Sequence, residues 1–419
     1  MSLRERIQEL GRQGLAASRS LALMDAGHKN RILRAMADGL LAREAEILAA
    51  NAQDLAAAEA KGLSPAMLDR LRLDPKRLAA MAQGVREVAD LPDPVGEELA
   101  AWERPNGLKI RKVRVPIGVI GIIYESRPNV TSDAAVLCFK SGNATILRGG
   151  SEAFHSNTAI AAALQEAGGA AGLPPHSIQL VPFTDRESVR HMAEMNEYLD
   201  LIIPRGGKGL IETVVRLARM PVIKHYDGIC HVYVDAGADA AMAESILLNA
   251  KTTKPSACNA AETLLVHQDA AESFYARIIP VLTGAGVKLY GGPDLVEKYP
   301  GAVSPATEEN YRTEYLDLGL SIKTVADLEA AVAHIQNYGS RHSEVIVTEY
   351  PEAAAAFLNA VDSAVVLWNA STRFNDGGEF GFGCEIGIST DKLHARGPMG
   401  LPELTSYKYQ VTGTGQVRA

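Results

Sequence analysis

The sequence predicts an α/β protein with two doubly wound domains, in each of which helices cover a parallel sheet. Residues 118–124 form a continuous apolar run, which is typical of a strand buried on both faces of such a sheet. From residue 144 to 249, short apolar segments alternate with segments of helical period. A second series of the same kind begins after Cys258. Because alternating strands and helices build parallel sheets, the two series predict two such domains.

Length and composition agree with this interpretation. The chain has 419 residues, of which 47% are hydrophobic, so we expect a well-packed globular protein of two or three domains. The net charge is −8, and the chain has no block of lysine or arginine residues. It therefore lacks the positively charged surface by which proteins bind nucleic acid or an anionic membrane. There is no apolar stretch of about 18 residues and no secretory signal, so we expect a cytoplasmic protein that does not cross a membrane.

The four cysteines are scattered along the chain. Cys138, Cys230, Cys258 and Cys384 show no Cys-x-x-Cys spacing and no clustered histidines. This pattern argues against a zinc site and against a disulfide framework, and it suits a reducing compartment. We therefore expect no metal.

The first part of the chain reads as helices followed by a hairpin. Residues 3–91 are rich in Ala, Leu, Arg and Glu, and Pro65 and Pro75 mark breaks. Residues 91–96 form a loop. Around Asn106-Gly107, apolar and basic residues alternate from 102 to 116, which predicts a β-hairpin. Since a two-stranded ribbon is marginal alone, we expect it to pack on another subunit.

The remaining elements follow from the alternating pattern. In the first series we expect strands at 144–148, 178–181, 199–204, 222–224 and 231–234, and helices at 153–167, 186–196, 209–218 and 240–249. In the second series we expect strands at 263–266, 287–290, 321–325, 345–348 and 364–369, and helices at 270–282, 326–336 and 352–358. Residues 406–411 form a terminal strand.

Cys258 is the first candidate for a nucleophile. It lies in a polar segment together with Lys251 and Lys254, between an expected helix and an expected strand. A thiol attacks only as thiolate, and cationic neighbours lower its pKa. From position alone, an ordinary half-buried cysteine remains the alternative.

Three further segments carry polar groups at the ends of expected strands. Residues 205–209, Arg-Gly-Gly-Lys-Gly, open a helix and can bind a phosphate, although they match neither complete phosphate-loop pattern, and a glycine-rich turn is the alternative. Asn129 either donates to a developing oxyanion or caps the following helix. His225 is either a base or a hydrogen-bonded structural residue.

Five segments in this order make the chain resemble the aldehyde dehydrogenase superfamily, and within it the gamma-glutamyl phosphate reductase family. They are residues 116–131, 140–150, 203–209, 253–259 and 374–383. The resemblance implies an NADP-binding domain of residues 1–97 and 116–252 and a catalytic thiol domain of residues 253–395. It also implies an oligomerisation flap of residues 98–115 and 400–419, and hence a homodimer or homotetramer.

The resemblance also assigns roles to single residues. It implies that Cys258 is the catalytic thiol and that Asn129, with the backbone N–H of Cys258, binds the oxyanion. Arg148 and Glu314 stand where family members contact the two riboses of the cofactor. The expected cofactor site also includes Gly206 and Gly207. Candidates for holding the substrate are Arg127, His225, His342 and Arg373, and a surface charge is the alternative for Arg127, His342 and Arg373.

Two departures from the superfamily pattern refine the expected activity. Ser151 replaces the acidic residue that binds the adenosine ribose, which favours NADPH over NADH. His225 replaces the glutamate that activates water in hydrolytic members. The resemblance thus implies NADPH-dependent reduction of L-glutamyl 5-phosphate to glutamate 5-semialdehyde through a cysteine thioester, in proline biosynthesis. The alternatives are a CoA-acylating aldehyde dehydrogenase and a non-catalytic oligomeric binding protein on the same scaffold.

Overall fold

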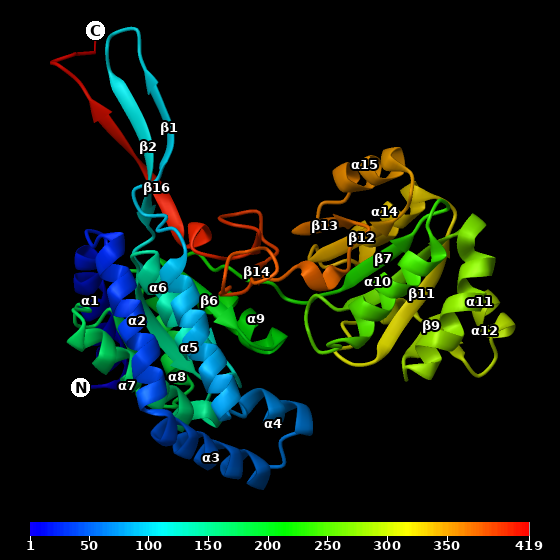
Figure 1. The fold of residues 1–419 in the computed structure, drawn as a ribbon, viewed down its shortest axis with the longest axis horizontal. Coiled ribbons are helices and arrows are strands. Elements are labelled where there is room, and N and C mark those ends of the chain that lie inside the picture. The colour runs from blue at the N-terminus through cyan, green and yellow to red at the C-terminus, as the bar shows by residue number, and fades with distance from the viewer. Residues whose placement is uncertain (419) are drawn as a thin grey trace. The chain divides into compact units, whose positions relative to one another are not determined.

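The computed structural model describes residues 1–418 and confirms two separate parallel sheets, each in its own unit (Figure 1). The first unit comprises residues 1–224, 381–387 and the chain from 399 onward. The second unit comprises residues 225–380 and 388–398. No helix of the described residues is long and apolar enough to cross a membrane.

The N-terminal region is helical, as predicted. Its helices are α1 (Leu3–Leu21), α2 (Ala26–Ala42), α3 (Glu44–Ala60), α4 (Pro65–Leu71) and α5 (Pro75–Asp90). Pro65 and Pro75 mark breaks because each occupies the first position of a helix, where a missing N–H costs nothing. The side chains of Ser64 and Asp74 cap these two helices.

The first sheet has the strand order β5-β4-β3-β6, and all its strands are parallel. Its elements are β3 (Val119–Tyr124), α6 (Asn129–Lys140), β4 (Ala144–Gly149), α7 (Phe154–Ala170), β5 (Ile178–Leu180), α8 (Glu187–Glu194), β6 (Leu201–Arg205) and α9 (Lys208–Leu217). All of β3 is buried, as its apolar run predicts. The chain reverses direction across the sheet between β3 and β6. Open α/β sheets bind ligands at the carboxyl ends of the strands beside such a reversal, so this edge is the place to look for a site.

The second sheet has the order β10-β9-β11-β8-β7-β12-β13 and is also parallel. Its elements are β7 (Cys230–Val234), α10 (Ala240–Thr252), β8 (Ala261–His267), α11 (Gln268–Gly284), β9 (Lys288–Gly291), α12 (Pro293–Lys298), β10 (Val303–Pro305), α13 (Glu308–Tyr311), β11 (Gly319–Val325), α14 (Leu328–Tyr338), β12 (Ser343–Val347), α15 (Pro351–Ala360) and β13 (Val365–Trp368).

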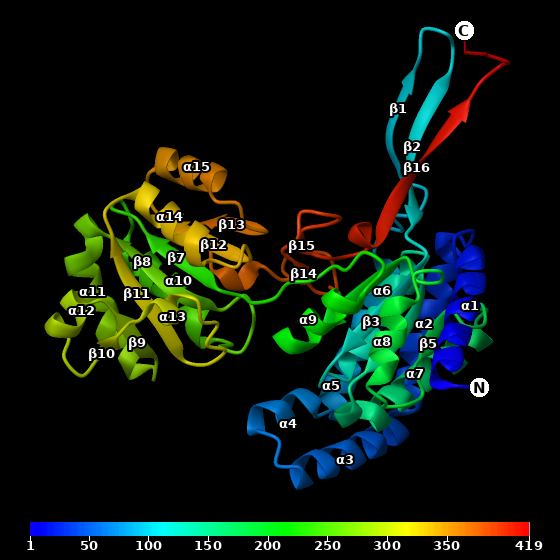
Figure 2. The same ribbon diagram turned by 180° about the vertical axis from the view of Figure 1, so that it is seen from behind.

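Helices cover both faces of this second sheet (Figure 2). Val232 and Val234 of β7 pack in a cluster with residues of α10, α11 and α12. Tyr233 points the other way and packs with α14 and α15. The period of two along a strand thus places alternate residues of β7 in two cores.

Three sequence predictions differ from this arrangement. The strand at 231–234 and the helix at 240–249 were expected in the first series, but β7 lies between β8 and β12 of the second sheet. The units accordingly divide after Lys224 rather than after residue 252. The strand predicted at 222–224 is wrong, since only Val222 forms a single bridge, to Ile202. The short elements α12, β10 and α13 were not predicted.

The predicted hairpin and terminal strand form one small antiparallel sheet. Strand β2 (Lys109–Pro116) lies between β1 (Glu98–Glu103) and β16 (Thr405–Thr412). The pairing of β16 runs from Thr405 opposite Pro116 to Thr412 opposite Lys109. All of β1 and nearly all of β16 are exposed. We call these three strands the flap.

Candidate active site

Several predicted residues of the first unit gather at the carboxyl edge of its sheet. Arg148 is near the end of β4 and Ser151 begins the turn that follows it, while Gly206 and Gly207 lie between β6 and α9. Asn129 begins α6 after β3. Because β4, β3 and β6 are adjacent and parallel, these segments share one edge.

Two carboxylates that were not predicted hold the loops at this edge. The N–H of Gly207 donates to Glu125 Oε2 over 2.9 Å, so a carboxylate already lies at the positive end of α9. An added Cβ at Gly206 would lie 2.4 Å from the same oxygen and 2.8 Å from Leu210 Cδ2, so glycine leaves room for both side chains as they stand. Glu152 Oε1 accepts the Ser126 N–H at 2.6 Å. Glu125 therefore occupies the N–H group at the start of α9 that the sequence predicted for a phosphate.

The side chain of Arg148 is directed into the protein. Its Nε donates to Ser188 Oγ over 3.2 Å, and its Nη2 donates to the carbonyls of Thr184 and Asp185 over 3.1 and 3.3 Å. Burial lowers the pKa of this guanidinium. The guanidinium thus fixes the segment after β5, whereas the neighbouring Ser151 is exposed.

Asn129 does not cap α6. The capping position belongs to Pro128, and Asn129 is already the first residue of the helix. Its Nδ2 donates instead to Asp133 Oδ2 over 2.8 Å, one helical turn further along. Burial raises the pKa of Asp133 to about 6. Asp133 thus orients the amide of Asn129. It was not predicted from the sequence, although its i, i+4 spacing from Asn129 is a signal that could have identified it.

In the second unit, Cys258 lies in the loop between α10 and β8 and is half-buried. The S–H of Cys230 donates to the carbonyl oxygen of Cys258 over 3.2 Å. Gly228 packs against the backbone of Cys258 so closely that an added Cβ would lie 1.9 Å from the carbonyl oxygen. Burial, above all, raises the pKa of Cys230, which therefore remains a thiol. The backbone of Cys258 is thus held from β7 and the segment before it.

Glu314 takes part in the same arrangement. Its Oε1 accepts the N–H of Gly228 at 2.9 Å, and burial raises the pKa of its carboxyl group. Only one carboxylate oxygen makes this bond, so the other oxygen is compatible with the predicted contact to a ribose hydroxyl.

Two predicted histidines lie beside Cys258. Ligand atoms of His225, His342 and Cys258 all lie within 4.8 Å of one another. The Nδ1 of His225 is 2.9 Å from the carbonyl oxygen of Ile388, an acceptor, so Nδ1 carries the proton and Nε2 keeps its lone pair in the neutral ring. The Nδ1 of His342 is 2.8 Å from Ser343 Oγ, and the two imidazole centroids are 5.6 Å apart. The fold therefore gathers a thiol and two imidazoles at the amino ends of β7, β8 and β12.

Lys251 does not serve as a cationic neighbour of the thiol. Its Nζ lies 2.6 Å from Glu262 Oε2, and both side chains are fully buried. Burial raises the pKa of Glu262 and lowers the pKa of Lys251, while the charge of each group opposes the shift of the other and favours the ion pair. The role expected for Lys251 is therefore wrong, because its charge is paired with a buried carboxylate.

The remaining substrate candidates lie in different units. Arg373 is half-buried in the second unit, and its carbonyl accepts from Asn259 Nδ2 at 3.4 Å. Thr372 Oγ1 donates to the Asn259 carbonyl over 2.6 Å, so the segment after β13 holds the neighbour of Cys258. Arg127 is half-buried in the loop between β3 and α6 of the first unit.

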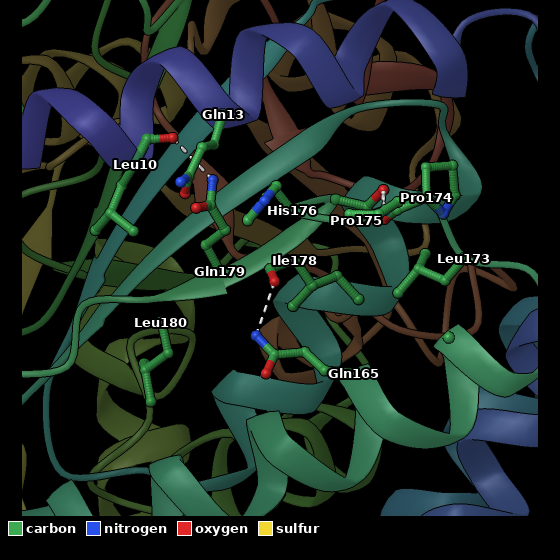
Figure 3. A pocket seen from close by; sticks show the side chains of 12 residues that line it. Leu10, Gln13, Gln165, Leu173, Pro174, Pro175, His176, Ile178, Gln179 and Leu180 are labelled. Carbon is green, nitrogen blue, oxygen red and sulfur yellow. Dashed lines mark hydrogen bonds between the residues drawn. The ribbon is translucent and has the colours of Figure 1, made fainter.

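A cavity of about 510 Å³ in the first unit contains none of these residues (Figure 3). It is lined by parts of α1 and α7 and by the segment that leads into β5. The amide nitrogen of Gln179 donates to the Leu10 carbonyl over 2.8 Å, and that of Gln165 donates to the Ile178 carbonyl over 2.9 Å. These amides join elements of the fold, and the cavity lies beside the segment that leads into β5, away from the predicted cofactor residues.

Comparison with known proteins agrees with this geometry. The sequence profile of the aldehyde dehydrogenase family matches residues 3–288. The chain is 54% identical to the gamma-glutamyl phosphate reductase of Paramagnetospirillum magneticum over 411 residues, which cover 98% of this chain and 97% of that protein. It is 52% identical to the enzyme of that name from Geotalea daltonii over 418 residues and the full length of both. The crystal structure of gamma-glutamyl phosphate reductase from Thermotoga maritima superposes with a TM-score of 0.96 at 46% identity, covering 99% of this chain and 100% of that one.

Proposed function

The chain belongs to the aldehyde dehydrogenase family, and we propose that it acts as a gamma-glutamyl phosphate reductase, an oxidoreductase of proline biosynthesis. The observation that carries this proposal is identity above 50% over almost the entire chain to curated reductases of that name. The substrate is then L-glutamyl 5-phosphate, and the products are glutamate 5-semialdehyde and phosphate.

The chemistry begins at Cys258. Its thiolate attacks the acyl carbon, the bond to the phosphate oxygen breaks, and phosphate leaves with that electron pair, so that a thioester forms on Cys258. The N–H of Cys258 donates no hydrogen bond to any group of residues 1–418, so it is available to the oxyanion. We assign the second oxyanion donor to Asn129, whose amide is oriented by Asp133.

We propose NADPH as the cofactor, and when bound it supplies the hydride that reduces the thioester. The hemithioacetal then collapses to the aldehyde and regenerates the thiolate of Cys258. The residues proposed to hold the cofactor are Gly206, Gly207, Ser151 and Glu314, together with Arg148 once its guanidinium turns from Ser188 and the carbonyls of Thr184 and Asp185 toward the ribose. Ser151 supports NADPH over NADH because a serine, unlike an acidic residue, tolerates a phosphate on the ribose.

The presence of His225 supports reduction of an acyl phosphate. It argues against the alternative reaction, in which an aldehyde is oxidised and water hydrolyses the thioester. A hydrolytic enzyme needs a base that activates water against the thioester, and a glutamate provides it in hydrolytic relatives. Here the corresponding side chain is an imidazole whose Nδ1 is bonded to the Ile388 carbonyl. In the reductive direction phosphate is already a good leaving group, and no water has to be activated.

The test is reduction of NADP⁺ by glutamate 5-semialdehyde in the presence of phosphate, run with NAD⁺ in parallel. The wild-type chain should require phosphate, and coenzyme A should not replace it. Cys258→Ala should abolish hydride transfer while nucleotide binding survives. Near-normal turnover of that variant would exclude the thiol mechanism, and a preference for coenzyme A would indicate an acylating aldehyde dehydrogenase instead.

We further propose that the flap joins two copies of the chain into a dimer or a tetramer. The exposed aromatic side chains of Trp102, Tyr407 and Tyr409 support this, since such residues are enriched in protein interfaces. A variant without β16 should run as a monomer in sedimentation, and an unchanged assembly would exclude this role.

A further inference from the structure

We infer that Cys258, His225 and His342 form a binding site for a divalent zinc ion, which reversibly blocks the nucleophilic thiol. The cysteine spacing in the sequence argued against a zinc site. The fold nevertheless brings one thiol and two imidazoles together from three separate segments, all within the second unit.

The ligand set matches the chemistry of zinc. Zinc binds thiolate sulfur and imidazole nitrogen in tetrahedral sites, and three protein ligands leave a fourth position for water. With zinc–sulfur and zinc–nitrogen bonds of about 2.3 and 2.0 Å, tetrahedral ligands lie roughly 3.5 Å apart. The three ligand atoms lie within 4.8 Å of one another, so each has to move by about 1 Å or less. Cys258 is half-buried in a loop, where a rotation about its side-chain bond provides such a movement.

The surroundings of the histidines provide the outer contacts that metal-binding imidazoles use. Such a histidine donates its other ring N–H to a carbonyl or similar acceptor, which fixes its tautomer and orientation. His225 does so to the Ile388 carbonyl over 2.9 Å, which leaves the lone pair of Nε2 for a metal. His342 has Ser343 Oγ at 2.8 Å from its Nδ1. Soft sulfur and imidazole ligands select zinc over magnesium or calcium, which prefer oxygen.

Occupation of this site has a defined chemical consequence. The thiol of Cys258 loses its proton to solvent when the zinc–sulfur bond forms, and the sulfur lone pair is then no longer available to attack a carbonyl. Zinc should therefore inhibit the enzyme reversibly and protect Cys258 from alkylation. The inhibition rests on the proposed function, whereas the binding does not.

The experiment titrates the full-length, metal-free protein with Co²⁺ and follows its absorption spectrum, then displaces the cobalt with Zn²⁺. One equivalent should give the visible bands of four-coordinate cobalt together with a thiolate-to-cobalt charge-transfer band. Cys258→Ser should lose the charge-transfer band, and His225→Phe should weaken binding by at least the roughly 10–100-fold that loss of an outer contact costs. Cys384→Ala and His155→Gln, which alter a cysteine and an exposed histidine of the first unit, should bind cobalt like the wild type.

The outcomes separate the two proposals. A charge-transfer band that persists in Cys258→Ser, or equal affinity in His225→Phe, would overturn the metal site. So would stoichiometric cobalt without a thiolate band in the wild type. If the spectrum behaves as expected but the protein lacks phosphate-dependent reductase activity, the metal site stands and the proposed function fails. If both hold, zinc should abolish turnover and a chelator should restore it.

Discussion

Replacement of Gly228 with alanine should slow the acylation of Cys258 by about 100-fold, because the new methyl group has no room beside the nucleophile's backbone. An ideal Cβ at this position would lie 1.9 Å from the carbonyl oxygen, 2.6 Å from the carbonyl carbon and 2.7 Å from the Cα of Cys258. Non-bonded heavy atoms prefer separations of about 3.5 Å or more, so the two backbones have to separate by more than about 1 Å. These are backbone atoms, and no change of rotamer can relieve the clash. A misplacement of about 1 Å in an active site costs on the order of 100-fold in rate.

The assay compares phosphate-dependent turnover with the rate at which iodoacetamide alkylates Cys258. Both should fall in Gly228→Ala, while circular dichroism should show that the variant is folded like the wild type. The matched control is Gly284→Ala, at the exposed end of α11, where an added Cβ meets nothing within 4 Å. This control should keep full activity and gain up to about 1 kcal/mol of stability. Near-normal turnover of a folded Gly228→Ala protein would refute the conclusion that Gly228 positions the nucleophile.

Three other predictions follow from the two sites. Asn129→Ala should lower the acylation rate by about 100-fold or more, as expected for loss of an oxyanion donor, and an unchanged rate in rapid-mixing experiments would exclude that role. The pKa of Asp133 is about 6, so its ionised form, which accepts the Asn129 amide, is lost as the pH falls through 6. The wild-type rate should decline there, and Asp133→Asn should lose this limb of the pH profile relative to the wild type. Glu262→Leu alone should reduce the free energy of unfolding by about 3–5 kcal/mol because it strands a buried ammonium, whereas the double variant with Lys251→Met should lose much less, as measured by chemical denaturation.

The sequence predicted the secondary structure well where the pattern was strong. The continuous apolar run became β3, which is buried along its whole length, and Asn106-Gly107 lies in the turn between β1 and β2. Membership in a sheet was harder to predict. The pattern around β7 looks like that of its predecessors, but its neighbours β8 and β12 both come later in the chain. The pattern of hydrophobic residues indicates that a strand is buried. It does not indicate which other strands that strand pairs with.

In the candidate site, too, the sequence indicated single residues but not the residues that contact them. The sequence pointed to Cys258 but gave no reason to connect it with Cys230, the first residue of β7, or with Gly228 just before that strand. Both act through the backbone of Cys258, one by a hydrogen bond to its carbonyl and the other by the absence of a side chain. Contacts of this kind depend on how neighbouring strands are aligned at their amino ends. Asp133 is different, because its spacing from Asn129 on a predicted helix would have sufficed to identify it.

Lys251 shows why proximity along the chain is a poor guide to electrostatics. It lies at the end of α10, only one loop away from the thiol, yet its ammonium points into the core and bonds to Glu262 at the start of β8. A buried ammonium without a partner would cost several kcal/mol, so the fold provides a carboxylate for it. The imidazoles of His225 and His342, which come from distant segments, do have ligand atoms within 4.8 Å of the Cys258 sulfur. The side chains that the fold brings to the thiol are therefore two histidines that the sequence suggested as substrate contacts and, for His225, as a base. Zinc affinity is the property that tests whether they also act as metal ligands.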